Sequence, residues 1–201
     1  VLQEPEHGAR SEALDRNQAA LACLARGECA QAETLLQEAV TLDPQDPTLR
    51  MNLSRTRVRL GQTEWNAGRA QAALDWFHLA FAADPDGGAP AEWIASILLR
   101  RGERAAAVRE VEAGLASTPA SAGLLRLRAE LAFLAGDLAA AVADARAALV
   151  LENNPRARER LLQLEEEERI FREFLTDSTA HFDSRYDPQD AALVQHISDR
   201  V

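Results

Sequence analysis

The sequence predicts an all-α fold, an α-solenoid in which about four helix–turn–helix repeats form a right-handed superhelix that ends in a capping helix. Alanine and leucine dominate the composition and aromatic residues make up 5%, which favours small side chains packed between close helices over strand-rich folds. Glycine recurs every 34 residues at Gly68, Gly102 and Gly136, and Pro85 and Pro119 share this interval. A fixed interval of this length is typical of stacked helical repeats.

An earlier copy of the repeat lies at Gly27, Ala32 and Pro44, 41 residues before the second copy. This distance is one repeat plus seven residues, and seven residues make almost two helical turns. The first helix of the second repeat can therefore be longer without rotating its apolar side far from its neighbours. We expect an N-terminal extension at 1–12 and four repeats at 13–46, 47–87, 88–121 and 122–155.

Small residues occupy matching positions in every repeat. The first helices have Ala20, Gly61, Ala95 and Ala129 at this position, and the second helices have Ala32, Ala73, Ala107 and Ala141. Small residues let two antiparallel helices approach closely. Together with the turn glycine and the closing proline, the pattern resembles the tetratricopeptide repeat. The fourth unit departs from that pattern, because Asn153 stands where the closing proline is expected and Pro155 follows.

The segment at 156–175 is predicted to be a capping helix, because the last helix pair of a repeat array has an apolar side that needs cover. The acidic run Glu165–Glu168 is interpreted as a solvated face of this helix. The predicted apolar stripe consists of Leu161, Leu162, Leu164, Ile170, Phe171, Phe174 and Leu175.

The tail at 176–201 has a different character from the repeats. Thr176–Thr179 is polar and is predicted to be a loop, and His181–Asp187 is predicted to be a strand. Pro188 is predicted to open a further helix. Because a single strand is not stable alone, we interpret the tail as the start of a truncated second domain.

The stretch from Ser178 to Asp187, followed by a helix, resembles the entry strand of the peptidase MA-like family, a bacterial family of zinc metallopeptidase-like domains. The zinc site of that family uses a His-Glu-x-x-His helix, and none of the four histidines here is followed by glutamate. No catalytic or metal-binding residue is therefore carried over, and we expect this chain not to be an enzyme. A rival resemblance, to repeat-linked methyltransferases, rests on Phe182-Asp183 alone.

The composition argues against several classes of function. A net charge of −10 does not suit nucleic-acid binding, since phosphate recognition needs a basic surface. The sequence has no apolar run long enough to predict a membrane span. Cys23 and Cys29 are too few for a disulfide framework and are expected to be buried. We expect no cofactor. All 22 basic residues are arginine, which favours a bacterial source with a GC-rich genome.

The tetratricopeptide resemblance implies that the first helices line a concave groove. The candidate binding residues are its exposed positions, Asn17, Arg55, Gln62, Trp65, Asn66, Glu92, Arg100, Arg126 and Glu130. A tryptophan between arginines suits an extended peptide, because aromatic and arginine side chains often dominate binding. The alternative is that these are ordinary surface residues. Repeats that hold the C-terminal tails of chaperones use a lysine–asparagine set, and this sequence has no lysine.

The predicted function is therefore a protein–protein interaction scaffold that holds a peptide or protein partner in this groove. One alternative is the non-catalytic arm of a bacterial envelope zinc peptidase-like protein whose catalytic domain lies beyond this chain. Another is a structural module that self-associates into a homo-oligomer. The compartment stays open, with the bacterial periplasm or cell envelope favoured over the cytoplasm.

Overall fold

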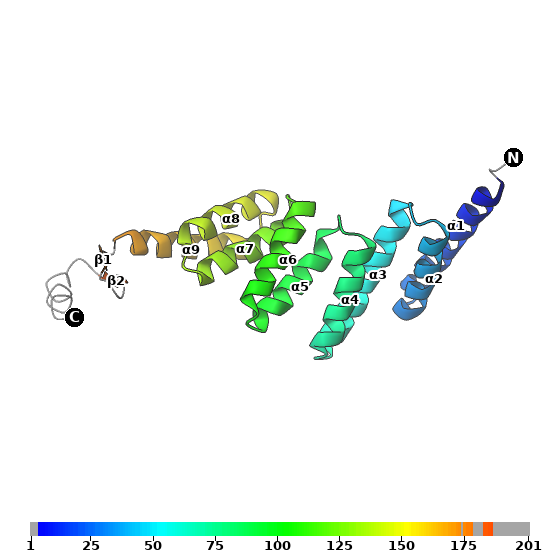
Figure 1. Ribbon diagram of the computed structural model, residues 1–201, viewed down its shortest axis with the longest axis horizontal. Coiled ribbons are helices and arrows are strands. Elements are labelled where there is room, and N and C mark those ends of the chain that lie inside the picture. Colours follow the sequence, from blue (N-terminus) through cyan, green and yellow to red (C-terminus); the bar gives the residue numbers. More distant parts are fainter. Residues whose placement is uncertain (1–3, 174, 179–182, 187–201) are drawn as a thin grey trace. The chain divides into compact units, whose positions relative to one another are not determined.

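The computed structural model describes residues 4–173, 175–178 and 183–186. Within this part of the chain, nine α-helices follow one another and consecutive helices are joined by short turns (Figure 1). The helices are α1 (Glu4–Ala25), α2 (Cys29–Leu42), α3 (Pro47–Asn66), α4 (Ala70–Ala83), α5 (Gly88–Arg100), α6 (Arg104–Ser117), α7 (Ala122–Leu134), α8 (Leu138–Leu151) and α9 (Pro155–Glu173). The predicted all-α fold of helix pairs is confirmed. The segment predicted as an N-terminal extension is largely helical and continuous with the rest of α1.

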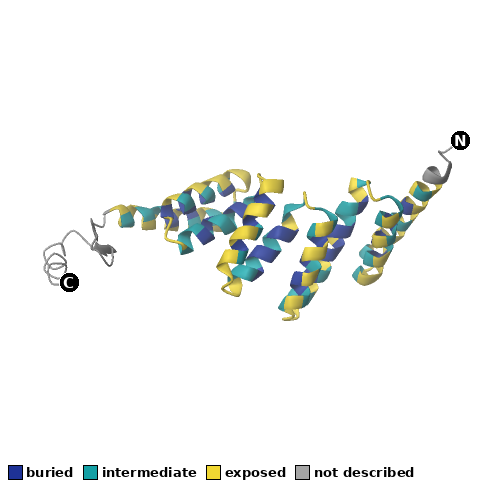
Figure 2. Ribbon diagram, viewed as in Figure 1, coloured by how far each residue is buried: buried dark blue, intermediate teal, exposed yellow. Residues whose placement is uncertain are grey.

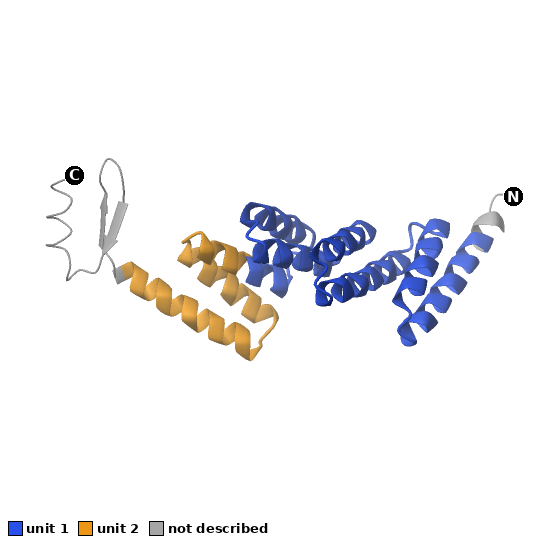
Figure 3. Cartoon of the chain, turned by 90° about the horizontal axis from the view of Figure 1, so that it is seen from below, with its two compact units in different colours: residues 1–127 blue, residues 128–201 orange. Residues whose placement is uncertain are grey.

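The chain divides into two compact units, residues 1–127 and residues 128–201 (Figure 3). The first unit holds α1 to α6 and the start of α7. The second unit holds the rest of α7, then α8, α9 and a short hairpin.

The recurring glycines end the first helix of each pair. Their φ angles are positive, at 81° for Gly27, 76° for Gly68, 79° for Gly102 and 82° for Gly136. This left-handed conformation costs a residue with a side chain about 1–2 kcal/mol, so glycine is favoured there. At one such turn the Arg69 N–H donates to the Glu64 carbonyl, which satisfies an end group of α3. The positive φ that each turn requires therefore explains why glycine recurs at 34-residue intervals.

In the first unit, small residues lie where helices cross. Ala20, Ala32, Ala73 and Ala107 are fully buried, and Figure 2 shows buried positions on the helix faces that meet a neighbouring helix. At Gly61 of α3, an added Cβ would lie only 2.6 Å from the Phe77 ring of α4. The helices α3 and α4 therefore pack so closely here that no side chain fits between them.

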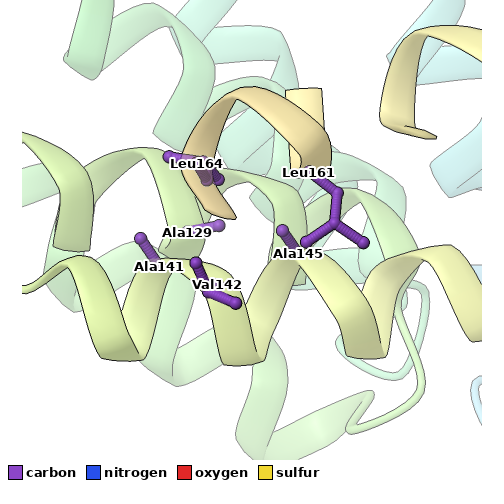
Figure 4. Packing of buried hydrophobic residues seen from close by; sticks show 6 residues of the cluster. All are labelled: Ala129, Ala141, Val142, Ala145, Leu161 and Leu164. Atoms are coloured by element: carbon purple, nitrogen blue, oxygen red, sulfur yellow. The ribbon is translucent and has the colours of Figure 1, made fainter. Parts of the chain in front are cut away.

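The core of the second unit joins α7, α8 and α9. Its buried residues are Ala129, Ala141, Val142, Ala145, Leu161 and Leu164 (Figure 4). The α9 residues Leu161 and Leu164 cover the small side chains of α7 and α8. The predicted stripe on α9 was too wide, because Leu162 is 61% exposed and Ile170 is 40% exposed. These two residues lie outside the side of α9 that packs against α7 and α8.

The acidic run of α9 lies in ion pairs with arginines. Glu165 accepts from Arg146 of α8 at 2.7 Å, and Glu166 accepts from Arg169 at 2.7 Å. The hydrogen bond from Arg169 holds the pKa of the Glu166 carboxyl below its usual value, against the opposing effect of desolvation. The acidic face of α9 is therefore neutralised locally by neighbouring guanidinium groups.

After α9, strand β1 (Leu175–Ser178) pairs antiparallel with strand β2 (Asp183–Tyr186). Leu175 lies opposite Tyr186 and Ser178 lies opposite Asp183. The loop predicted over Thr176–Thr179 is therefore wrong for its first three residues, because a strand partner satisfies backbone groups that a polar sequence seemed to leave to solvent. β2 lies within the predicted strand. The helix predicted after Pro188 lies outside the described residues.

Candidate functional site

A cleft of about 570 Å³ lies beside α3 in the first unit. Its walls come from α3, from the connection between α4 and α5, and from the first residues of α5. We call it the α3 cleft, and its lining residues are Met51, Ser54, Arg55, Val58, Arg59, Gln62, Asp84, Asp86, Gly87, Gly88, Ala89 and Pro90. Arg55 and Gln62 were predicted as site residues from the sequence. Arg59, one turn after Arg55, was missed.

A second cleft of about 330 Å³ lies between α5 and the start of α7, also in the first unit. We call it the α5 cleft, and it is lined by Ala89, Glu92, Trp93, Ser96, Gly123, Arg126 and Leu127. The predicted residues Glu92 and Arg126 meet here as an ion pair at 3.8 Å. Trp93, which the sequence analysis missed, stacks on Phe77 with ring centroids 5.3 Å apart. Ala89 lines both clefts, so they follow one another along α5.

Trp65 lies at the end of α3 and is partly buried. It packs against a core cluster that includes Phe77 and Ile94. The guanidinium carbon of Arg100, on α5, lies 5.7 Å from the centroid of the Trp65 ring. Cation–π contacts at such exposed sites contribute about 0.5–1 kcal/mol. The structure thus brings two predicted site residues together, and neither of them lines the α3 cleft or the α5 cleft.

The remaining predicted residues are more scattered. The Asn17 side-chain oxygen of α1 accepts a hydrogen bond from Asn52 of α3 at 2.9 Å. Asn66 is exposed at the end of α3. Glu130 belongs to the second unit, where it accepts a hydrogen bond from Arg160 at 2.9 Å. The structure therefore groups Arg55 with Gln62 in the α3 cleft, Trp65 with Arg100, and Glu92 with Arg126. Asn17, Asn66 and Glu130 belong to none of these groups.

Three arginines of α3 have two different roles. Arg55 and Arg59 are exposed, and neither guanidinium forms an ion pair within the part of the chain that the structure describes. Arg57 is only 8% exposed. Its Nε donates to Glu33 of α2 at 2.9 Å, and its Nη1 donates to the Leu79 carbonyl of α4 at 3.1 Å. Arg57 therefore ties three helices together, while Arg55 and Arg59 remain available to a ligand.

Cys23 is buried, Cys29 is partly exposed, and both are free thiols. The prediction of two buried cysteines is therefore correct for Cys23 and only partly correct for Cys29. Among the described residues, no group of three or more histidine, cysteine, aspartate or glutamate side chains is arranged to hold a metal ion. No helix in the same part of the chain is long and apolar enough to cross a membrane.

Comparison with protein families matches two segments of the chain. Two models, both described as "Tetratricopeptide repeat", match residues 15–56 and residues 94–158, together just over half of the sequence. A comparison with curated proteins gives no match. The stretch that resembles the peptidase MA-like family lies outside both matched segments, so that resemblance stays a prediction.

Solved structures share the fold. PilF from Pseudomonas aeruginosa is 18% identical over 82% of this chain and 72% of its own, with a TM-score of 0.54. MamA (41-end) from Desulfovibrio magneticus RS-1 is 19% identical over 79% of this chain and 86% of its own, with a TM-score of 0.52. The first TPR of Spaghetti (RPAP3), bound to the HSP90 peptide SRMEEVD, is 21% identical over 58% of this chain and 93% of its own, with a TM-score of 0.52. The helix pairs, their turn glycines and the matched family models together show that the chain belongs to the tetratricopeptide repeat family.

Proposed function

We propose that this chain is a protein-interaction scaffold that binds an extended peptide segment of a partner protein along α3, α5 and the start of α7. The observation that carries the proposal is the pair of clefts that follow one another on these helices and share Ala89. Four of the residues predicted from the sequence line them, namely Arg55, Gln62, Glu92 and Arg126.

The chemistry of this surface suits a peptide. Tryptophan and arginine are enriched among the residues that contribute most to protein binding. Trp65 and Trp93 both pack on the core, so little side-chain entropy is lost when a ligand contacts them. Glu92 and Arg126 add polar groups that can pair with peptide amides or side chains. The arrangement provides rigid aromatic contacts beside adjustable polar ones.

One of the structural neighbours supports a peptide as ligand. The first TPR of Spaghetti (RPAP3) holds the HSP90 peptide SRMEEVD. The likeness concerns the fold, so it does not transfer that peptide to this chain. It supports the coarser proposal that helix pairs of this kind present a surface to a short peptide segment.

The proposal is tested by capturing partners from a lysate of the source organism with the wild-type chain and with Trp65→Ala. We expect Trp65→Ala to lose partners that the wild type retains, because a large amphipathic ring contributes far more than flexible polar neighbours. Trp76→Ala is the matched control, since Trp76 is also a partly buried tryptophan but lies on α4. The helical circular dichroism of each variant must equal that of the wild type.

Because Trp65 also packs on the core, Arg100→Glu provides a second variant that leaves the ring in place. Arg100 is exposed, and its reversal changes the charge beside Trp65 without removing buried surface. Partner lists that are the same for the wild type, Trp65→Ala and Arg100→Glu would contradict the proposed surface.

A further inference from the structure

The α3 cleft is associated with an irregularity in the repeat. Helix α3 has 20 residues, whereas α5 and α7 each have 13. Its start at Pro47 is fixed by Asp46, whose side chain accepts from the Thr48 N–H at 2.7 Å. The position one 34-residue repeat before Gly88, the first residue of α5, is position 54. Because α3 begins at Pro47, it starts seven residues before that position.

The seven additional residues at the start of α3, 47–53, contribute to the α3 cleft. Met51, which lies in the added segment, is one of its lining residues. The corresponding α5 cleft is formed by α5 and α7, which are equal in length, and its volume is about 330 Å³ instead of about 570 Å³. Both volumes fall within the range of about 300–1,000 Å³ that is known for ligand sites. The irregular repeat thus coincides with the larger of these two clefts.

Charges of both signs line the α3 cleft, and they come from different elements. Arg55 and Arg59 lie one turn apart on α3, whereas Asp84 and Asp86 lie on the connection between α4 and α5. In the described part of the chain no ion pair joins the two arginines to the two aspartates. The cleft therefore keeps a positive wall and a negative wall separate.

We infer that the α3 cleft binds an extended peptide segment in which an acidic and a basic residue are adjacent. Successive side chains of an extended chain point in opposite directions. An adjacent pair can therefore present its carboxylate to Arg55 and Arg59 and its cation to Asp84 and Asp86. A purely acidic segment would meet two carboxylates, and a purely basic segment would meet two guanidinium groups. This inference rests on the proposed function and specifies the ligand of one part of that surface.

The inference is tested by selecting random heptapeptides displayed on phage against the whole immobilised chain. We expect enriched peptides to share an adjacent acidic–basic pair. The dissociation constant of a labelled enriched peptide, measured by fluorescence anisotropy, should rise about tenfold in Arg59→Glu and in Asp86→Arg, since each change replaces an attraction by a repulsion. Arg109→Glu is the matched control, because Arg109 is an exposed arginine on α6 and should leave binding unchanged.

The double variant Arg59→Glu with Asp86→Arg gives a sharper result. It leaves one cation and one carboxylate on each wall, because Arg55 and Asp84 remain, so it should bind the enriched peptide and a peptide with the acidic and basic residues exchanged about equally. Enrichment of purely acidic or purely basic peptides on the wild-type chain would overturn the inference. Binding that depends on Trp65 but on neither Arg59 nor Asp86 would also overturn it, while leaving the proposed function intact. If no peptide is enriched on the wild-type chain, the proposed function fails as well.

Discussion

Substitution of Gly61 by alanine tests the close crossing of α3 and α4. The added methyl carbon would lie 2.6 Å from the Phe77 Cε1 atom, about 1 Å inside ordinary carbon contact. Phe77 is fully buried and stacks on Trp93, so its ring has little room to move. Overpacking of this kind costs about 1–3 kcal/mol, and alanine recovers about 1 kcal/mol through its higher helix propensity. We expect Gly61→Ala to lower the free energy of unfolding by up to about 2 kcal/mol.

The assay is urea denaturation followed by helical circular dichroism. Gly8→Ala is the control, because Gly8 lies in α1 and an added Cβ would meet nothing within 4 Å. That change should stabilise the chain by up to about 1 kcal/mol. In a Phe77→Leu background, Gly61→Ala should lose most of its cost, since the smaller side chain makes room. If Gly61→Ala stabilises the chain as Gly8→Ala does, the close crossing of α3 and α4 is wrong.

Three further predictions concern the turn, the buried arginine and an exposed carboxyl. Gly102→Ala should lower the free energy of unfolding in urea by about 1–2 kcal/mol, because φ is positive at this position and an added Cβ meets no other atom. Gly102→Asn should lower it less, and equal decreases for the two variants would contradict this cause. Arg57→Ala should lower the free energy of unfolding by about 3 kcal/mol, because Glu33 loses its partner in a largely buried ion pair. A decrease below about 1 kcal/mol would contradict that role of Arg57. The hydrogen bond from Arg69 holds the pKa of Glu64 below its usual value, so stability from this pair is present at neutral pH and is lost as pH falls through the lowered pKa. A carbon-13 NMR titration should show this pKa returning toward its ordinary value in Arg69→Gln.

The repeat fold could be predicted because its signals are local. The glycine at each turn needs a positive φ, so its 34-residue spacing appears directly in the sequence. The small residue Gly61 was likewise placed at a helix crossing. Its contact Phe77 lies in the second helix of the same pair. Such features depend on positions within one repeat, and they can be found without knowledge of long-range contacts.

The features that could not be predicted depend on contacts between distant residues. Arg57 lies one helical turn before Gly61, so the helical period places it on the packed side of α3, but the period does not reveal its partners. Its partner Glu33 is 24 residues away. The α3 cleft was missed because it also needs Asp84 and Asp86 of the connection between α4 and α5, and neither was predicted as a site residue. Strand β1 was missed since its pairing with β2 overrides a polar sequence.

The position of Arg57 has a consequence for how the chain opens in the native state. Repeat arrays often open by fraying from an end, because each repeat contacts only its neighbours. Here the side chain of one residue of α3 contacts α2 and α4 together. Separation of α1 and α2 from α3 would expose the buried Arg57 cation and break its hydrogen bonds to Glu33 and Gln37 of α2 at once. Amide hydrogens from α2 to α4 should therefore exchange with solvent as one cooperative group, more slowly than helices without such a tie.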